Sequence, residues 1–183
     1  MKEVFSCGDI NTDGICRSIC ARWLYTGTKK GGSVTDIDEL GTKEFIKLLW
    51  DAADSDESID KNNLLKQVSI DETEAAKAFS PNWMATQLTK GGGKAILTAW
   101  DDSLKKNGIN DIRKVMEGHS MATNKVEGKL QFLDPNTSCW EFNNSLEFYE
   151  FLPQYLLNGT GGPAGFTGYK KLLRWQGIVY KYS

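Results

Sequence analysis

The order of the sequence patterns predicts an α+β fold, in which helices come first and an antiparallel sheet follows. Apolar residues recur at helical spacing through residues 15–27 and again through 42–54. Short apolar runs typical of buried strands follow at 94–100, 115–123 and 129–134. Helices followed by strands in this order are typical of a sheet packed against a helical part.

The first predicted helix follows a polar loop. Residues 6–14, SCGDINTDG, combine glycine, asparagine and aspartate, as loops do. Thr12 or Asp13 can cap the helix that comes next, which we expect to end at Gly27 and the KKGG turn. Its wide apolar stripe predicts a buried helix and consists of Ile15, Cys16, Ile19, Cys20, Trp23 and Leu24.

Three further segments complete the first half. Residues 42–54 form a second amphipathic helix, and residues 57–78 are polar with a helical character. Ser80 and Pro81 begin another helix, because serine caps helices and proline suits the first helical position. The glycines at 91–93 end it.

The second half contains a hairpin, a helix and a terminal strand region. A turn at 125–128 connects two of the strands, and a helix follows at 143–157, where Pro153 kinks or divides it. The glycine-rich loop 158–168 lacks the spacing of phosphate-binding and dinucleotide-binding loops. The chain then finishes on one or two strands.

Length and composition predict one globular domain. With 183 residues, 40% of them hydrophobic, the chain can bury a sizeable core. We expect a single domain over 1–183, with a helical part at about 13–90 and a sheet part at about 94–183.

Charge and hydropathy exclude several classes of function. The net charge of −2, with mixed signs throughout, gives no basic field for nucleic acid. No apolar run is long enough to span a bilayer, so we expect no integral membrane segment. The start, MKEVFSCGDINTDG, has no apolar region of a signal peptide.

The cysteines do not predict a metal site. Cys16 and Cys20 are spaced C-x3-C, but there is a single histidine and no second close cysteine pair. We therefore expect no metal and no cofactor. Reduced thiols fit this pattern better than disulfides, and Cys7 and Cys139 are interpreted as incidental.

Cys16, His119 and Asp134 together suggest nucleophilic catalysis. Cys16 opens a predicted helix, whose N-terminal amides and dipole favour a thiolate. His119, the sole histidine, can exchange its proton with that thiol, and Asp134 at the end of the next strand can orient the imidazole. The Cys16 amide and the Asn11 side chain can stabilise a developing oxyanion.

Two sequence blocks resemble a known family. DGICRSICARWL resembles the nucleophile helix of the YopT/AvrPphB family of bacterial effector cysteine proteases. GHSMA, GKLQFLDPN and WEF resemble its second block, where the catalytic histidine leads to an acidic residue in an Asp-Pro-Asn turn. NNSLEFYEFLPQYL fits the helix that comes next in that family, whereas residues 36–90 match no family block.

The resemblance implies a fold, residue roles and a setting. It implies a papain-like fold, with a helical lobe that carries the Cys16 helix and a twisted antiparallel sheet that carries His119 and Asp134. Cys16 would be the nucleophile, His119 the general base and acid, Asp134 its orienter and Asn11 the oxyanion donor. It also implies secretion by a bacterium without a Sec signal and cleavage of a host protein in the host cytoplasm, and we expect a monomer.

Other interpretations remain open at this stage. Cys16 can be a small buried apolar residue, Cys20 a core residue and Asp134 a turn residue. The same triad can perform glutamine deamidation or transglutamination, and a non-catalytic binding module can use the same scaffold. The loop 158–168 is interpreted as a flexible rim or lid beside the active cleft.

Overall fold

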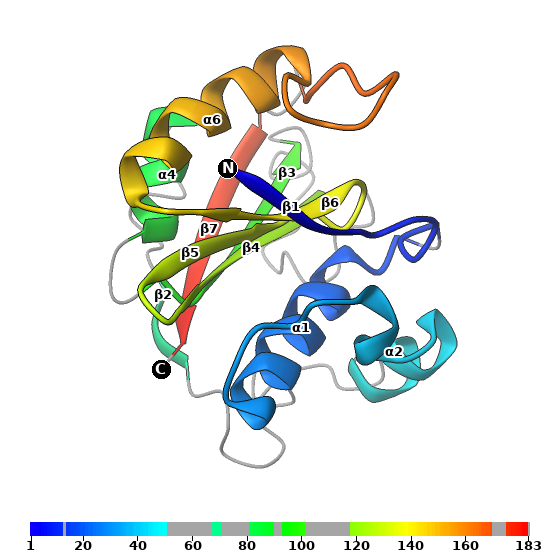
Figure 1. Cartoon of the computed structure of the whole chain (residues 1–183). Coiled ribbons are helices and arrows are strands. Elements are labelled where there is room, and N and C mark those ends of the chain that lie inside the picture. Colours follow the sequence, from blue (N-terminus) through cyan, green and yellow to red (C-terminus); the bar gives the residue numbers. More distant parts are fainter. Residues whose placement is uncertain are drawn as a thin grey trace.

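The computed structural model describes most of the chain. The described residues are 1–12, 14–50, 67–70, 81–89, 93–101, 118–169 and 175–182. They form a twisted sheet with helices on both of its faces (Figure 1). Within the described ranges, no helix combines the length and the apolar character needed to cross a bilayer.

One antiparallel sheet organises the molecule. Its strands are β1 (Lys2–Ser6), β2 (Gln67–Ile70), β3 (Ala95–Asp101), β4 (Gly118–Val126), β5 (Lys129–Leu133), β6 (Ser138–Phe142) and β7 (Trp175–Tyr182). They lie in the order β1-β6-β5-β4-β3-β7-β2, and every pair is antiparallel. The helices are α1 (Cys16–Lys30), α2 (Lys43–Trp50), α4 (Pro81–Thr89) and α6 (Ser145–Asn158), with a short 3-10 helix η1 (Ile37–Leu40).

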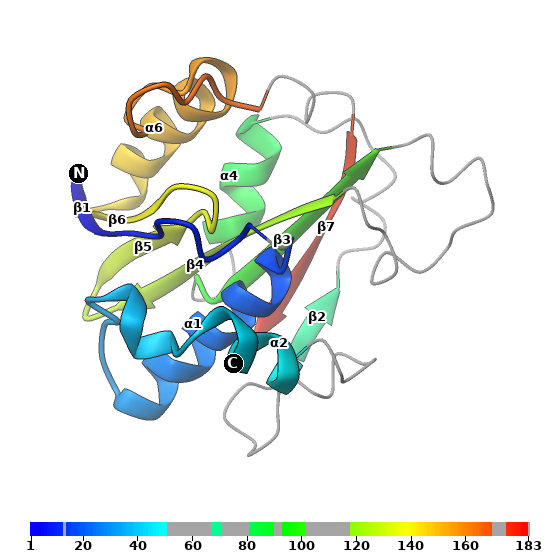
Figure 2. The same cartoon turned by 90° about the vertical axis from the view of Figure 1, so that its right-hand side faces the viewer.

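The sheet separates two apolar cores. Side chains alternate across a strand, so Ile96 of β3 faces α1 while its neighbours Ala95 and Leu97 face the opposite core. Helices α1 and α2 cover one face, and α4 and α6 cover the other, as both views show (Figures 1 and 2). The predicted α+β class is confirmed, and a helical layer carrying the Cys16 helix packs on an antiparallel sheet as the papain-like expectation requires.

The expected division into a helical and a sheet part is only approximate. Strands β1 and β2 come from the first half of the chain and were not predicted, nor was β6. Strand β1 pairs with β6, from Lys2 opposite Glu141 to Ser6 opposite Ser138. Such pairing joins segments far apart in the sequence, so the pattern of a five-residue strand alone does not reveal it. The rest of the polar segment 57–78 lies outside the described residues.

The boundaries of α1 differ from the expectation at both ends. Its N-cap position is Ile15, and no side chain among the described residues caps it, so Thr12 does not have the expected role and Asp13 lies outside the description. The helix continues past Gly27 and ends at Gly31, which has a left-handed backbone with φ of 70°.

Helix α6 is a single helix despite its internal proline. Asn144 caps its start by accepting a hydrogen bond from the Glu147 amide, and Pro153 lies inside it without dividing it. Buried apolar side chains hold the helix on the sheet and compensate for the backbone hydrogen bond that proline removes. They are Phe148, Leu152, Tyr155 and Leu156.

Candidate active site

The site forms where strands β4 and β5 separate. Their pairing runs from Val126 opposite Lys129 to Ala122 opposite Leu133, and the chain then turns away at Asp134. The next part of β4 keeps its pairing with β3, but on its other side it meets α1 instead of β5. The Ser120 backbone amide donates to Cys16 Sγ at 3.3 Å.

Cys16 is the first residue of α1, close to the predicted start of that helix. No described side chain caps this helix, and the positive end of its dipole at this position favours a thiolate. Cys16 is 8% exposed, so most of the residue is covered by protein. The Ser120 hydroxyl, which also contacts Thr98 Oγ1 at 2.9 Å, adds a second donor to the sulfur.

Asp134 occupies the first position of a tight turn between β5 and β6. The Thr137 amide donates to the Asp134 carbonyl at 2.9 Å, and the Asn136 amide donates to Asp134 Oδ1 at 3.0 Å. Pro135 fits the second position because its fixed φ suits such a turn. The residue is therefore both a turn former and a candidate site residue, and it is fully buried.

His119 connects the other two residues. Its Nε2 lies 2.8 Å from Asp134 Oδ1, and the imidazole also hydrogen-bonds the Cys16 side chain. Since Asp134 engages Nε2, the nitrogen available to the thiol is Nδ1. The structure thus brings Cys16, His119 and Asp134 into one buried hydrogen-bonded series.

The charges of the three groups support one another. Burial opposes ionisation of the Cys16 thiol, but the hydrogen bond and charge of His119 and the Ser120 donors lower its pKa. Burial likewise opposes the imidazolium, but the Asp134 carboxylate and Cys16 raise the pKa of His119 to about 10. The pKa of Asp134 is lowered against burial by His119 and by hydrogen-bond donors. The site therefore shifts Cys16 toward the thiolate and His119 toward the imidazolium.

Two tyrosines complete the surroundings of Asp134. The hydroxyls of Tyr155 and Tyr169 both donate to Asp134 Oδ2, Tyr169 at 2.6 Å. Sequence reasoning did not select either residue, nor Ser120 or Asn136. The Asp-Pro-Asn turn was a signal for Asn136, whereas the tyrosines reach the site only through tertiary packing.

Asn11 lies in the loop before α1 and contacts the Asp134 turn. Its Nδ2 donates to Asn136 Oδ1 at 2.5 Å, while its own Oδ1 is buried and has no hydrogen-bond partner among the described residues. The Cys7 amide, which donates to the Thr137 carbonyl at 2.9 Å, fixes the loop against the same turn. The loop and the turn therefore form one unit beside α1.

The remaining cysteines belong to the interior. Cys7, Cys20 and Cys139 are buried, and burial raises the pKa of each thiol. All four cysteines are free thiols. In the part of the chain that is described, no three His, Cys, Asp or Glu side chains are arranged to hold a metal ion.

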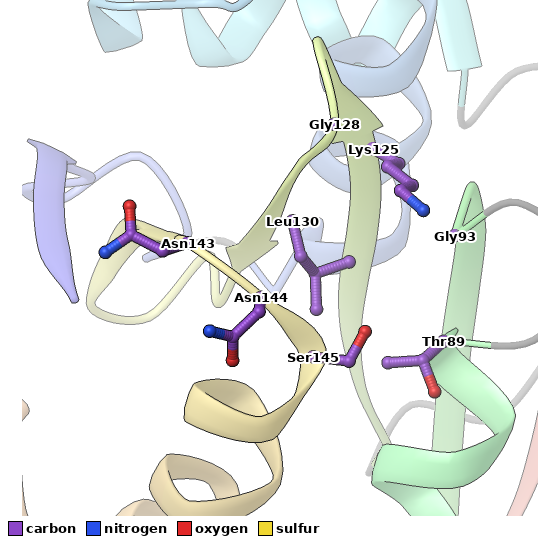
Figure 3. Close-up of a pocket in the computed structure, with 8 residues that line it drawn as sticks. All are labelled: Thr89, Gly93, Lys125, Gly128, Leu130, Asn143, Asn144 and Ser145. Carbon is purple, nitrogen blue, oxygen red and sulfur yellow. The ribbon is translucent and has the colours of Figure 1, made fainter.

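A cavity of about 200 Å³ lies elsewhere. Its walls include Lys125 and Leu130 near the β4–β5 turn, and Asn144 at the start of α6 (Figure 3). Lys125 and His119 are near opposite ends of β4, roughly 20 Å apart at the rise of a strand. The cavity is therefore separate from the Cys16 site.

Comparison with known proteins identifies the family. Residues 3–163 match the family model Peptidase_C58, described as Yersinia/Haemophilus virulence surface antigen, and this range includes Cys16, His119 and Asp134. No curated protein and no solved structure matches the chain. The family groups cysteine peptidases of the bacterial effector type. The chain therefore belongs to the Peptidase_C58 family of virulence-associated cysteine peptidases, as its two sequence blocks predicted.

Proposed function

We propose that this peptidase uses Cys16, His119 and Asp134 as its catalytic triad. The observation that carries the proposal is the buried imidazole of His119, whose two sides engage the other two residues. The lowered pKa of Cys16 and the raised pKa of His119 support a reactive ion pair. The location of Cys16 at a helix N-terminus supports the same assignment.

Each residue then has a defined task in peptide-bond cleavage. Cys16 Sγ attacks the carbonyl carbon of the scissile amide, and the carbonyl oxygen becomes an oxyanion. The proton on His119 Nδ1 passes to the leaving amine, and a thioester remains on Cys16. His119 then removes a proton from water, which attacks the thioester and releases the acid. Asp134 holds Nε2 throughout and stabilises the imidazolium.

Two donors are proposed for the oxyanion. One is the backbone amide of Cys16, at the uncapped start of α1. The other is Asn11 Nδ2, which has two hydrogens and gives one of them to Asn136. The second hydrogen of Asn11 remains available for the substrate.

The proposed substrate is a protein of the host cell. Membership in a family of bacterial virulence effectors supports secretion, and we infer cleavage of a host protein in the host cytoplasm. The free thiols, none of them in a disulfide, are compatible with a reducing compartment.

The experiment uses Cys16→Ala and a thiol control one helical turn away, Cys20→Ala. A library of peptides from a digested eukaryotic proteome is incubated with each protein, and new peptide ends are read by mass spectrometry. Wild type and Cys20→Ala should produce new ends, and Cys16→Ala should produce none although thermal unfolding shows that it is folded. Cleavage by Cys16→Ala would refute the assignment. Conversion of glutamine to glutamate in uncut peptides would instead indicate deamidation.

A further inference from the structure

The chain after α6 forms a loop, residues 159–169, which we call the strap. It turns back beside the end of α6 (Figure 1). At Gly159 and Gly168 the backbone has φ of 74° and 88°, and a Cβ at either position would collide with a backbone carbonyl. The Tyr169 amide donates to the Leu156 carbonyl at 2.5 Å and ties the end of the strap to the helix. The end of the strap, Tyr169, lies at the site, and these contacts determine the path of the strap.

Aromatic packing determines where the Tyr169 side chain lies. Phe166 of the strap contacts the Tyr155 ring at a centroid distance of 4.9 Å and the Tyr169 ring at 5.2 Å. Tyr155 is itself fully buried on α6. The strap, Phe166 and α6 therefore hold the Tyr169 ring against the site.

Tyr169 contacts both members of the His–Asp pair. Its ring stacks on the His119 imidazole, with centroids 5.0 Å apart and planes inclined by 28°. Its hydroxyl donates to Asp134 Oδ2 at 2.6 Å and lies 3.2 Å from His119 Nε2. Burial, and then the charge of Asp134, raise the pKa of Tyr169, so its hydroxyl remains a donor throughout the working pH range.

The same hydroxyl extends the network to the loop before α1, which carries Asn11. It accepts a hydrogen bond from Asn136 Nδ2 at 3.1 Å, and Asn136 Oδ1 accepts from Asn11 Nδ2. A continuous hydrogen-bond series therefore joins Asn11, Asn136, Tyr169 and Asp134.

We propose that Tyr169 is a positioning residue. It shields the hydrogen bond between His119 and Asp134 from water, and it links this pair through Asn136 to the side-chain amide of Asn11. This inference rests on the proposed triad. The ring shields one face of the imidazole, and the hydroxyl fixes the carboxylate oxygen that does not face Nε2. Both effects keep the Nε2–Oδ1 hydrogen bond formed while the other ring nitrogen exchanges its proton with Cys16.

The chain offers a clean way to test the proposal, because it contains a single histidine. In protein labelled with ¹⁵N-histidine, every imidazole signal comes from His119. We would measure the exchange rate of the Nε2 proton with water in wild type, Tyr169→Phe and Tyr169→Ala. Tyr149→Phe is the matched control, because the Tyr149 hydroxyl is also hydrogen-bonded, to Thr89, on a partly exposed part of α6.

Tyr169→Phe keeps the ring and removes a hydrogen bond to a charged group, so we expect exchange to accelerate about tenfold or more. Tyr169→Ala also removes the ring that covers the imidazole, so the Nε2 proton should exchange faster still. In Tyr149→Phe the exchange rate should equal that of wild type. Exchange rates that remain within about twofold of wild type in folded Tyr169→Phe would overturn the proposal. If Tyr169→Ala does not fold, Tyr169→Phe decides the result alone.

A second measurement separates this inference from the proposed function. The alkylation rate of Cys16 by iodoacetamide is measured from pH 5 to pH 10 in the same proteins. We expect its pH profile to shift in Tyr169→Phe and to be unchanged in Tyr149→Phe. An ordinary thiol profile for Cys16 in wild type would instead refute the triad, whatever the exchange measurement gives for Tyr169.

Discussion

Replacing Asp134 with asparagine removes the charge at the centre of the site and keeps its shape. Oδ1 of the new side chain can still accept from His119 Nε2 and from the Asn136 amide, which bond Asp134 Oδ1 at 2.8 and 3.0 Å. The new Nδ2 would face the hydroxyls of Tyr155 and Tyr169, which can rotate to accept instead of donate. We therefore expect Asp134→Asn to fold.

The magnitude of the effect follows from the pKa of His119. That pKa is raised from 6.5 to about 10 although burial acts in the opposite direction, and Asp134 is the leading cause of the rise, ahead of Cys16. Without the carboxylate charge, burial is opposed only by Cys16 and by neutral hydrogen bonds. We expect the midpoint of His119 to fall by at least about 2 pH units, which corresponds to about 3 kcal/mol of lost preference for the imidazolium.

The assay is an NMR titration of the labelled imidazole, which is unambiguous in a protein with one histidine. Asp36→Asn is the matched control, because exposed Asp36 only caps the short helix η1, a role that asparagine also fills. Its midpoint should equal that of wild type. A midpoint for folded Asp134→Asn that stays within about half a unit of wild type would refute the proposed role of the carboxylate.

Three further outcomes are expected from the same contacts. Ser120→Ala removes a donor that lowers the pKa of Cys16, so alkylation of Cys16 at pH 6 should slow several-fold, about as expected for one lost hydrogen bond; an unchanged rate would exclude that role. Gly168→Ala places a Cβ against a backbone carbonyl and should lower the free energy of unfolding by about 2 kcal/mol or more, as measured by urea denaturation. Gly165 has φ of 86° and open space around it, so Gly165→Ala should lower the free energy of unfolding by only about 1 kcal/mol. An equal decrease in Gly165→Ala and Gly168→Ala would contradict the strap geometry. In a Cys16→Ala background Asp134 still raises the pKa of His119, so the fold should be stabilised fully below about pH 6.5. This stabilisation should be lost as the pH rises above that value, and a flat difference from the double variant Cys16→Ala/His119→Gln would contradict it.

Much of the site could be predicted because its determinants are local. A polar loop before an apolar stripe indicates the start of α1 and places Cys16 at the helix N-terminus. The Asp-Pro-Asn sequence encodes the turn that buries Asp134 and ends the pairing of β4 with β5. His119 and Asp134 therefore come together through one hairpin and one turn.

The unpredicted parts depend on contacts between distant segments. Tyr169 reaches His119 across 50 residues, and Asn11 reaches Asn136 across 125. Strand β1 forms by pairing with β6, and neither five-residue strand has a distinctive pattern of its own. A single sequence carries no signal for such pairings, because each depends on how the strap and the N-terminal loop pack against the completed sheet.

Activation of Cys16 by His119 is tested most directly by the alkylation rate of each cysteine against pH. Peptide mass spectrometry resolves Cys16 from Cys7, Cys20 and Cys139, whose burial should keep them slow. In wild type, Cys16 alone should react rapidly below about pH 7, well under the pKa of a free thiol near 8.5. In folded His119→Gln, that reactivity should disappear. A Cys16 that titrates near pH 8.5 and reacts equally in both proteins would contradict the ion pair and the catalytic assignment built on it.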